Sequence, residues 1–314
     1  MPDPADTAAE APRVSIVLAL GHDSDYVAAA LESVRAQTFE DWELLIVDNG
    51  AAHPDRVAEL IGDDPRMSMI TIDHSATAGL SRNIGVQHTR GGLITLLDDD
   101  DVWMPERLRT HVAHHDENPS APASFSGYWH MDAAGERFGT DWRSRQTPAS
   151  AILRGAAPTP LGPTLMIRRE AFSAIGGHSP EIPILVDFEL GLRLTLLGDL
   201  IYIDELLVGY RRHSTNMTSM DPANVRLRRL VMEEMIDRQR WAARGRGAID
   251  VEGWFEERLS GYRRSESRIA GIDAVRQVRR GRFRDALRGT GWGLRRAPLE
   301  FLRGVLETVL RRRR

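Results

Sequence analysis

The sequence contains no cysteine among its 314 residues. Disulfide bonds, thiolate metal sites and cysteine nucleophiles are therefore excluded. The overall balance of 42% hydrophobic and 27% charged residues is that of an ordinary globular protein. The absence of cysteine is compatible with a reducing compartment, and we expect a cytoplasmic protein.

Lysine is also absent, so all 41 basic residues are arginine, whose guanidinium group is always charged and fork-shaped. These charges are unevenly distributed. Residues 221–314 hold 24 Arg against 13 Asp and Glu, a formal charge of +11, whereas residues 1–220 hold 17 Arg against 32 acidic residues, or −15. We therefore expect the two parts to have different partners or to face each other.

Long hydrophobic runs are missing as well. No stretch reaches the ~18 consecutive apolar residues that a membrane-spanning helix needs. The first residues, MPDPADTAAEAP, are acidic and have no apolar centre, which is unlike a signal peptide. We expect residues 1–12 to form a disordered leader.

Strand and helix patterns alternate four times between residues 14 and 115. Continuous apolar runs typical of strands buried on both faces occupy 14–20, 43–47 and 93–97, and an alternating run predicts a further strand at 67–72. Helical patterns occupy 26–37, 54–61, 79–89 and 106–115. This alternation predicts an α/β fold with a mostly parallel sheet.

The pattern is looser beyond residue 123. We expect a strand at 123–130, a loop-rich segment at 132–160, a short apolar run at 164–167, helices at 169–175 and 184–197, and paired strands at 200–203 and 206–210. Arg-rich helices follow at 224–242, 251–261, around 272–287 and at 294–310. The sequence thus predicts an α-helical C-terminal region.

Four consecutive carboxylates, Asp98 to Asp101, stand between the apolar segments LITLL and VWMP. A block of like charge is usually a solvated face. Here both flanks are core candidates, so a cation is needed to relieve the repulsion. Mg²⁺ or Mn²⁺ fits, because both accept carboxylates together with substrate phosphates. His22, Asp23, Asp48 and Asn49 end two other expected strands, and the ends of parallel strands meet at one ligand-binding edge.

Several ordered pieces of the sequence together resemble the family 2 inverting glycosyltransferases of GT-A fold. They are VSIVLAL, WELLIVDNG, AGLSRNIGV, GGLITLLDDDDVWMPERL, GPTLMIRREAFSAIGG, VDFELGLRL and YRRHSTNMT, within roughly residues 14–218. The resemblance implies a Rossmann-like catalytic domain at 13–220, followed by the Arg-rich region 221–314. It also implies metal-dependent, inverting sugar transfer from a nucleotide-diphosphate sugar, in particular a UDP- or dTDP-sugar, to an acceptor hydroxyl. The acceptor is a carbohydrate, a lipid-linked sugar or a small molecule.

The resemblance assigns roles to individual residues. Asp187 matches the catalytic base. Asp98 and Asp100 match the DxD motif, in which Asp100 binds the metal and Asp98 holds the ribose or a metal-bound water. His213 lies in a closing loop near the metal, so the expected metal ligands are Asp100, Asp98 and His213. The expected donor-binding residues are Leu20, Asp48, Asn49, Arg82, Asn83, Asp98, Asp99, Arg211 and Arg212.

The sequence departs from the family pattern in three places. Ala19 to His22 stand where the family has Pro, Thr, Tyr and Asn, Asn49 replaces an acid, and Val186 replaces a Glu. A non-catalytic nucleotide-sugar-binding protein is therefore the main alternative. A sugar nucleotidyltransferase would need a Gly-rich phosphate loop after the first strand, which is not present.

Some of these residues also have simpler interpretations. Asp187 has the position of a helix-capping or dipole-stabilising carboxylate, and Arg82 is a candidate for a structural ion pair with the acidic cluster. His111, His114 and His115 have the spacing of metal ligands on one helix. We interpret these histidines as a solvated helix face.

The C-terminal helices allow three interpretations. They pack on the catalytic domain, they form a homo-oligomer, or they lie on an anionic membrane surface at its inner face, as a basic helix with Leu, Phe and Trp on its other side does. Nucleic acid binding is not expected, because few aromatic residues are interspersed among the arginines.

Overall fold

The structure is a computed structural model that describes residues 11–22, 24–51, 53–73, 76–213, 216 and 222–310. The chain divides into two compact units. The first consists of residues 1–149 and 158–219, and the second of residues 150–157 and 220–314. All but two residues of the expected leader 1–12, as well as Asp23 and the terminal arginines 311–314, lie outside the described residues.

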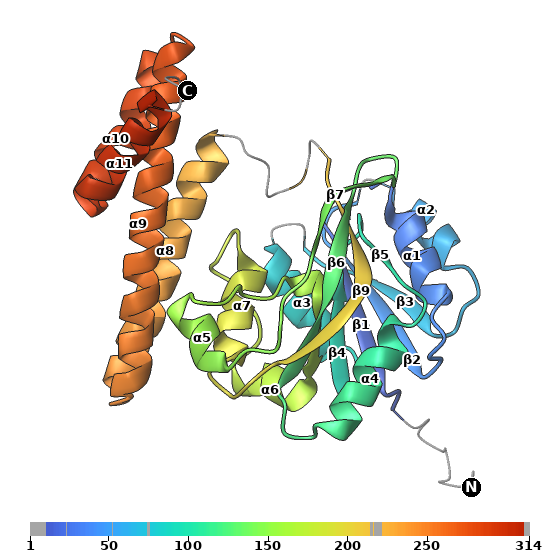
Figure 1. Ribbon diagram of the computed structural model, residues 1–314. Helices are drawn as coiled ribbons and strands as arrows, with labels where there is room; N and C mark the ends of the chain where they lie inside the picture. The colour runs from blue at the N-terminus through green and yellow to red at the C-terminus, as the bar shows by residue number, and fades with distance from the viewer. Residues whose placement is uncertain are drawn as a thin grey trace, which may run out of the picture. The chain divides into compact units, whose positions relative to one another are not determined.

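The first unit is an α/β unit built on one sheet (Figure 1). Its strands are β1 (Val14–Leu20), β2 (Trp42–Asp48), β3 (Met67–Thr71), β4 (Leu93–Leu97), β5 (Val102–Trp103), β6 (Ala123–Met131), β7 (Arg137–Trp142), β8 (Leu165–Arg168) and β9 (Ile201–Arg211). Its helices are α1 (Val27–Arg35), α2 (Pro54–Ile61), α3 (Ala78–Gln87), α4 (Arg107–Glu117), α6 (Arg169–Ala174) and α7 (Val186–Leu194), with a 3₁₀ turn η1 (Gly162–Thr164).

The sheet has the order β3-β2-β1-β4-β8-β6-β9-β5, with β7 paired to β6. Strands β3, β2, β1 and β4 are parallel, which confirms the expected parallel sheet in this half. The other half is mixed, because β8 is antiparallel to β4 and β6, and β5 is antiparallel to β9. The expected α/β architecture is thus confirmed, with parallel pairing concentrated in the first four strands.

Two hydrophobic cores fill the two faces of this sheet. Alternate residues of β1, including Ile16 and Leu18, pack with α1, α2 and α4 on one face, whereas Val17 packs with α3, α6 and α7 on the other. Burial on both faces explains why the strand sequences are apolar throughout instead of alternating with polar residues. The sheet therefore holds its strand ends in fixed positions.

Two expectations for the first unit were wrong in detail. Residues 201–211 form the single strand β9, so the strand pair expected at 200–203 and 206–210 is wrong. The pairing register with β6 shifts near the exposed residues Asp204 and Glu205, and the chain does not turn there. The segment 132–160 is less irregular than predicted, since it contains β7 and the short helix α5 (Ala149–Arg154). β7 alternates weakly and is mostly exposed, so its sequence gives little hydrophobic signal.

The second unit contains the long helices α8 (Pro222–Gly245), α9 (Ile249–Arg279), α10 (Phe283–Arg296) and α11 (Pro298–Leu310). The expected helices at 251–261 and 272–287 were wrong in their bounds, because α9 is continuous across the polar stretch between them. The expected helix at 294–310 is interrupted at residues 297–298, where Pro298 begins α11. No helix in the described part of the chain is long and apolar enough to cross a membrane.

Glycine contacts bring α9 and α11 together. A Cβ atom on Gly271 of α9 would collide with the backbone of Phe301, and one on Gly304 of α11 would collide with the backbone of Arg268. Ala270, Ala274 and Phe301 form the small core beside this crossing. The close approach makes α9, α10 and α11 a tightly packed group of helices.

Candidate active site

The parallel register aligns the ends of three strands at one edge of the sheet. Leu20, the last residue of β1, pairs with Asp48, the last residue of β2, and Leu18 pairs with Leu97, the last residue of β4. The acidic run 98–101 therefore begins beside the ends of β1 and β2. This edge is where open α/β sheets bind their ligands.

Three carboxylates of the run form one cluster. Single oxygen atoms of Asp98, Asp100 and Asp101 all lie within 4.8 Å of one another. Asp101 is fully buried, and while its Oδ1 accepts the backbone N–H of Arg211 at 2.9 Å, its Oδ2 has no hydrogen-bond partner. Burial, Asp98 and Asp100 raise the pKa of Asp101 well above its usual value. This donor set fits a hard divalent cation, for which oxygen ligands and negative charge are required.

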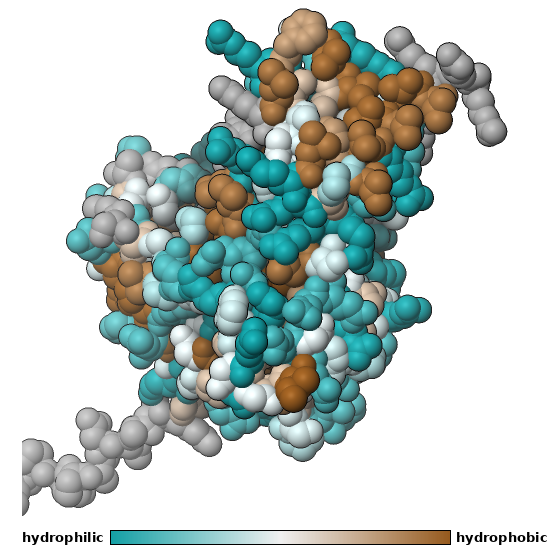
Figure 2. All heavy atoms as spheres, turned by 90° about the vertical axis from the view of Figure 1, so that its left-hand side faces the viewer, coloured by the Kyte–Doolittle hydropathy of each residue, from teal (hydrophilic) through white to brown (hydrophobic). Residues whose placement is uncertain are grey.

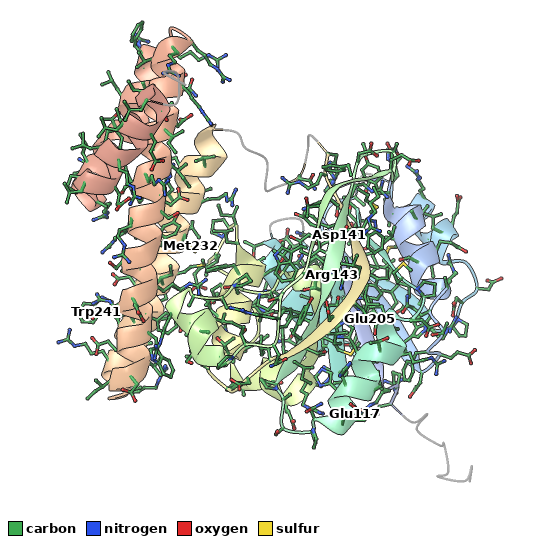
Figure 3. The ribbon with its side chains drawn as sticks, viewed as in Figure 1. Glu117, Asp141, Arg143, Glu205, Met232 and Trp241 are labelled. Carbon is green, nitrogen blue, oxygen red and sulfur yellow. The ribbon has the colours of Figure 1, made fainter. Side chains whose placement is uncertain are left out.

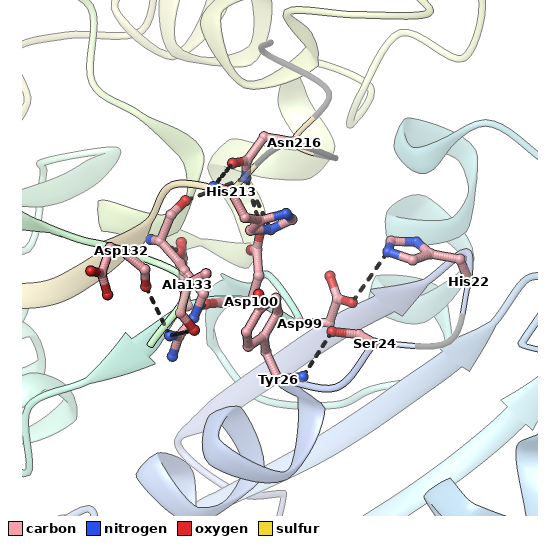
Figure 4. Close-up of polar contacts among 11 residues, drawn as sticks. His22, Ser24, Tyr26, Asp99, Asp100, Asp132, Ala133, His213 and Asn216 are labelled. Atoms are coloured by element: carbon pink, nitrogen blue, oxygen red, sulfur yellow. Dashed lines mark hydrogen bonds and ion pairs between the residues drawn. The ribbon is translucent and has the colours of Figure 1, made fainter. Parts of the chain in front are cut away.

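Asp100 contacts the chain segment after β9 (Figure 4). Its Oδ2 lies 2.9 Å from His213 Nε2 and accepts a hydrogen bond from Asn216 Nδ2 at 3.0 Å. Burial and the neighbouring Asp98 raise the pKa of Asp100 to about 6, although His213 opposes this shift. The expected proximity of His213 to the acidic cluster is thus present in the structure.

Asp99 points away from Asp100 and towards the end of β1 (Figure 4). Its Oδ2 lies 4.0 Å from Nε2 of His22. Burial raises the pKa of Asp99, and a hydrogen bond with Ser24 acts in the opposite direction. Successive carboxylates therefore face different neighbours, and Asp99 is not a member of the metal-type cluster.

Arg82 of α3 links the acidic cluster to Asp187. Its Nη2 donates to Asp98 Oδ1 at 2.6 Å and its Nη1 donates to Asp187 Oδ1 at 2.8 Å. Burial alone would lower the pKa of Arg82, but Asp187 and Asp98 outweigh it and raise this pKa. The ion pair that we considered as a simpler interpretation of Arg82 is therefore real, and it joins two candidate functional groups.

Asp187 lies in the first turn of α7, where the helix dipole favours a carboxylate. Leu185, the residue before α7 and two residues before Asp187, has φ of 63°, and it is the one non-glycine residue with positive φ in the described chain. Such strain is typical of positions fixed for function. Burial raises the pKa of Asp187, while Arg82 lowers it and Asp98 raises it further.

Gly162 forms the wall beside Asp187. A Cβ atom at Gly162 would lie 2.6 Å from Asp187 Oδ2, which is too close for any side chain. Gly162 begins η1, and β8 follows immediately. The sequence analysis missed this contact, and the GPT tripeptide at 162–164 carried no signal for it.

Several predicted donor-binding residues have packing or hydrogen-bond partners within the protein, and their role in donor binding stays a prediction. Leu20 belongs to the hydrophobic core on the α1 face of the sheet. Asp48 Oδ1 accepts the backbone N–H groups of Gly50 and Ala51, and Asn49 donates from Nδ2 to the carbonyl of Ala76 at 2.6 Å. Asp48 and Asn49 therefore shape the loops that follow β2 and β3.

Asn83 and Arg211 also have hydrogen-bond partners within the protein. Asn83 exchanges two hydrogen bonds of 2.8 Å with the backbone of His178. Arg211 donates to the carbonyls of Asp100, Asp132 and Ala133, and its guanidinium lies 4.5 Å from the centre of the Tyr26 ring. Arg211 thereby holds the backbone of the acidic run. The guanidinium of Arg212 lies 5.7 Å from the Tyr210 ring centre.

The interpretation of the α4 histidines as a solvated face was wrong for two of them. His111 and His115 are fully buried and share Ser124, with His111 Nδ1 at 2.7 Å and His115 Nε2 at 3.1 Å from its hydroxyl. Burial lowers the pKa of His111 well below its usual value and that of His115 to about 4. They are neutral core residues that satisfy a buried hydroxyl.

Residues 15–176, more than half of the chain, match the model of the family described as "Glycosyl transferase family 2". The chain belongs to glycosyl transferase family 2. This confirms the resemblance on which the expected fold and site residues were based. The family assignment extends from β1 through the acidic cluster to the end of α6.

Curated relatives support the family. The chain is 29% identical over 100 residues to the Escherichia coli UDP-Glc:alpha-D-GlcNAc-diphosphoundecaprenol beta-1,3-glucosyltransferase WfgD, which covers 32% of this chain and 40% of WfgD. It is 27% identical over 213 residues to the putative teichuronic acid biosynthesis glycosyltransferase TuaG of Bacillus subtilis, covering 66% and 82%. The chain spans 40%, 38% and 30% of the lengths of the first three curated relatives.

Solved structures support the fold. The crystal structure of Staphylococcus aureus TarS residues 1–349 in complex with UDP-GlcNAc matches with a TM-score of 0.58 and 14% identity, covering 89% of this chain and 90% of that one. The TarS 1–349 structure without a named ligand matches with a TM-score of 0.55 and 16% identity, covering 71% and 65%. The GT-A type fold is therefore shown.

Proposed function

We propose that this family 2 protein transfers a glycosyl group, with inversion, from a nucleotide-diphosphate sugar to an acceptor hydroxyl. The observation that carries the proposal is the linkage of two carboxylate centres through Arg82, which bonds Asp98 of the acidic cluster and Asp187 of α7. One centre suits the donor diphosphate and the other suits the acceptor. Both lie in the first unit, for which we propose the catalytic role of residues 13–220.

Asp187 is the proposed general base. The acceptor hydroxyl must lose its proton as its oxygen attacks the anomeric carbon, while the diphosphate leaves from the opposite face. A positioned carboxylate contributes about 10²- to 10⁴-fold to such a step. Burial and Asp98 raise the pKa of Asp187, which makes its ionised form a stronger base, and the hydrogen bond from Arg82 keeps the carboxylate oriented.

The proposed metal site is the cluster of Asp98, Asp100 and Asp101. The fit rests on the close approach of their oxygen atoms and on the unpartnered, buried Oδ2 of Asp101. A bound Mg²⁺ or Mn²⁺ ion would neutralise charge on the leaving diphosphate. His213 contacts Asp100 and is the neighbouring side chain that such an ion would meet, as the resemblance implied.

The proposed donor is a UDP- or dTDP-sugar. WfgD is named for UDP-Glc, and the TarS complex contains UDP-GlcNAc. Arg212 is the proposed residue for a charge-assisted bond to the diphosphate. Arg211 holds the backbone of the acidic run through its bonds to the carbonyls of Asp100 and Asp132. For the acceptor we retain the hydroxyl of a carbohydrate, a lipid-linked sugar or a small molecule.

The test is turnover of UDP- and dTDP-sugars with Mn²⁺, observed by proton NMR of the released or transferred sugar. Inversion gives a first-formed product with the anomeric configuration opposite to that of the donor. Asp187→Asn should lower turnover by about 10²- to 10⁴-fold and leave donor affinity within a few-fold. Asp55→Asn, at an exposed position on α2, is the matched control and should keep full turnover. Retention of configuration would contradict the proposal.

The same experiment addresses the non-catalytic alternative. Leu20 and Asn49, two positions that depart from the family pattern, face the core and a loop carbonyl. A protein that only binds nucleotide sugars would give donor affinity without turnover, and Asp187→Asn would then change neither quantity.

A further inference from the structure

Helix α10 carries an exposed apolar stripe. Phe283, Leu287 and Leu294 are spaced by four and seven residues, which places them on one side of the helix. Their exposed fractions are 63%, 72% and 41%. The charged residues Arg284, Asp285 and Arg295 occupy other sides of the helix. Thus α10 is strongly amphipathic, with its apolar side outward.

Helix α11 carries a second exposed stripe, formed by Leu299, Leu302, Leu306, Val309 and Leu310. Its buried residues Phe301 and Gly304 face α9 and α10 instead. Figure 2 shows the hydrophobic side chains gathered on the C-terminal helices, with hydrophilic residues around them. Monomeric soluble proteins rarely leave such contiguous apolar surface uncovered.

A groove of about 540 Å³ joins the two stripes. It is lined by Val278 at the end of α9, by Phe283 and Leu287 of α10, and by Val305 and Val309 of α11. The three helices are held together by the glycine crossing of α9 and α11, so the groove is built into the second unit. We call these stripes and the groove between them the apolar face.

The positive charge around the apolar face indicates which kind of partner binds there. Residues 276–310, the described end of the chain, contain nine Arg and three acidic residues, a formal charge of +6. Arg279 lines the groove itself. A second copy would bring an equally positive surface against this one, which Coulomb repulsion disfavours. An anionic partner with an apolar interior satisfies both the arginines and the leucines.

We propose that the apolar face docks on the surface of an anionic lipid bilayer. In this arrangement α10 and α11 lie along the interface, with Phe283, Leu287 and Leu306 inserted at the boundary of headgroups and acyl chains. A helix with a large apolar side, low mean hydropathy and arginines on its polar side binds in this manner. The arginines contact lipid phosphates, each adding electrostatic attraction that salt weakens. The proposal rests on the second unit alone and is independent of the transferase activity.

The experiment is co-sedimentation of the full chain with 100-nm vesicles of phosphatidylcholine, with and without 30% phosphatidylglycerol. The test variant is Leu287→Ser/Leu306→Ser, which changes side chains that are 72% and 57% exposed. The matched control is Trp241→Ser/Ile249→Ser, at residues 54% and 78% exposed on other parts of the unit. Figure 3 shows Trp241 far along the helix pair from α10 and α11.

We expect binding to the anionic vesicles, at least ten-fold weaker partitioning to the neutral ones, and a similar loss in 0.5 M NaCl. The Leu287/Leu306 variant should lose about ten-fold or more, because two inserted side chains are removed, whereas the Trp241/Ile249 control should bind like wild type. Circular dichroism should show equal helix content in all three proteins.

Three results would overturn the proposal. One is wild-type protein that stays in the supernatant with anionic vesicles. Another is binding that survives the Leu287/Leu306 change. The third is a lipid-free wild-type dimer, seen by sedimentation velocity, that becomes monomeric in this variant, since the apolar face would then be an interface between two copies.

Discussion

At the scale of single residues, Arg82 supplies the positive charge that balances two carboxylates of the site. It is largely buried and bonds two carboxylates, Asp98 and Asp187, from different elements. Removing a partner from a buried charge network is costly because the remaining charges cannot be solvated. The guanidinium therefore stabilises the fold and fixes the distance between the two carboxylate centres.

We expect Arg82→Met to lower the free energy of unfolding by about 3–5 kcal/mol, because it leaves Asp98 and Asp187 without their cation. Urea denaturation at pH 7.5 measures this change. Arg56→Met, at a more exposed arginine paired with the exposed Asp25, should cost less than about 1 kcal/mol. Equal effects of the two substitutions on the free energy of unfolding would show that the Arg82 ion pairs contribute no more to stability than an exposed ion pair does.

Loss of the proton from Asp100 should make the free energy of unfolding fall as the pH rises. Its carboxyl group has a pKa of about 6 in the folded state against 3.8 for a free carboxyl. The folded protein therefore holds this proton more tightly than the unfolded chain, and the contribution to stability, complete below about pH 4, is lost as pH rises through about 6. Asp100→Asn should raise the free energy of unfolding by roughly 2–3 kcal/mol at pH 7.5 and by little at pH 4.

The measurement for Asp100 is urea denaturation at several pH values, with Asp25→Asn as the exposed control. Added Mn²⁺ should stabilise wild type at pH 7.5 in proportion to the logarithm of its concentration, and should not stabilise Asp100→Asn to the same extent. Identical pH profiles for wild type and Asp100→Asn would contradict the assigned pKa.

At the scale of elements, η1 forms the wall of the proposed acceptor side, and α7 carries the proposed general base, Asp187. A side chain at Gly162 would enter the space of the Asp187 carboxylate. Gly162→Ala must therefore displace Asp187 or η1. We expect it to lower turnover by about 10²-fold, since a shift of about 1 Å in a catalytic group has this effect.

The control for this change is Gly92→Ala, where a Cβ atom meets nothing within 4 Å. Turnover and nucleotide binding should be measured for both variants. If Gly162→Ala kept wild-type turnover, Asp187 would not be confined as the structure indicates.

Helix α4 contributes a pH dependence of opposite sign to that of Asp100. His115 is buried, and burial lowers its pKa to about 4. The unfolded chain takes up a proton below pH 6.5 while the folded state does not, so stability is lost as the pH falls from about 6.5 to 4. This loss amounts to about 3 kcal/mol for a shift of this size.

We expect His115→Gln to flatten the acid side of the stability profile and His114→Gln, at the more exposed neighbour, to leave it unchanged. Guanidinium denaturation at pH 7, 6 and 5 measures both. An unchanged slope in His115→Gln would show that folding does not lower the pKa of His115.

The elements that sequence patterns predicted best are those buried on both faces. Strands β1, β2 and β4 are continuous apolar runs ending at Gly or Asp, so their bounds were correct within a residue. Alternation along β1 also places Leu20 on the core face together with Ile16 and Leu18. The bounds of α9 and α10 could not be predicted, since α9 packs through glycines that weaken its hydrophobic pattern.

For the site, the sequence predicted that Asp98, Asp100, Asp187, Arg82 and His213 lie close together, and the structure places them so. The sequence could not show which acids of the run point together, because Asp101 joins the cluster only through the turn that Arg211 holds. The wall at Gly162 depends on its contact with Asp187, 25 residues further along the chain. Such contacts leave no local signal.

At the scale of the whole molecule, the acidic and basic parts of the sequence correspond closely to the two units. The active-site candidates all lie in the first unit, and the positive apolar face lies in the second. This division of charge agrees with our proposals that the first unit binds a nucleotide sugar through a cation and that the second unit binds an anionic lipid surface. Each can be tested without altering the other.

We propose that the acidic cluster binds a nucleotide diphosphate together with a divalent cation. Isothermal titration calorimetry of UDP, dTDP and other nucleotide diphosphates, with and without Mn²⁺, tests it on wild type, Asp100→Ala and the exposed control Asp25→Ala. We predict that one nucleotide binds wild type and Asp25→Ala only with Mn²⁺, and that Asp100→Ala loses at least ten-fold in affinity. Binding that ignores both Mn²⁺ and Asp100, or no binding of any nucleotide, would show that the cluster is structural and would contradict the account.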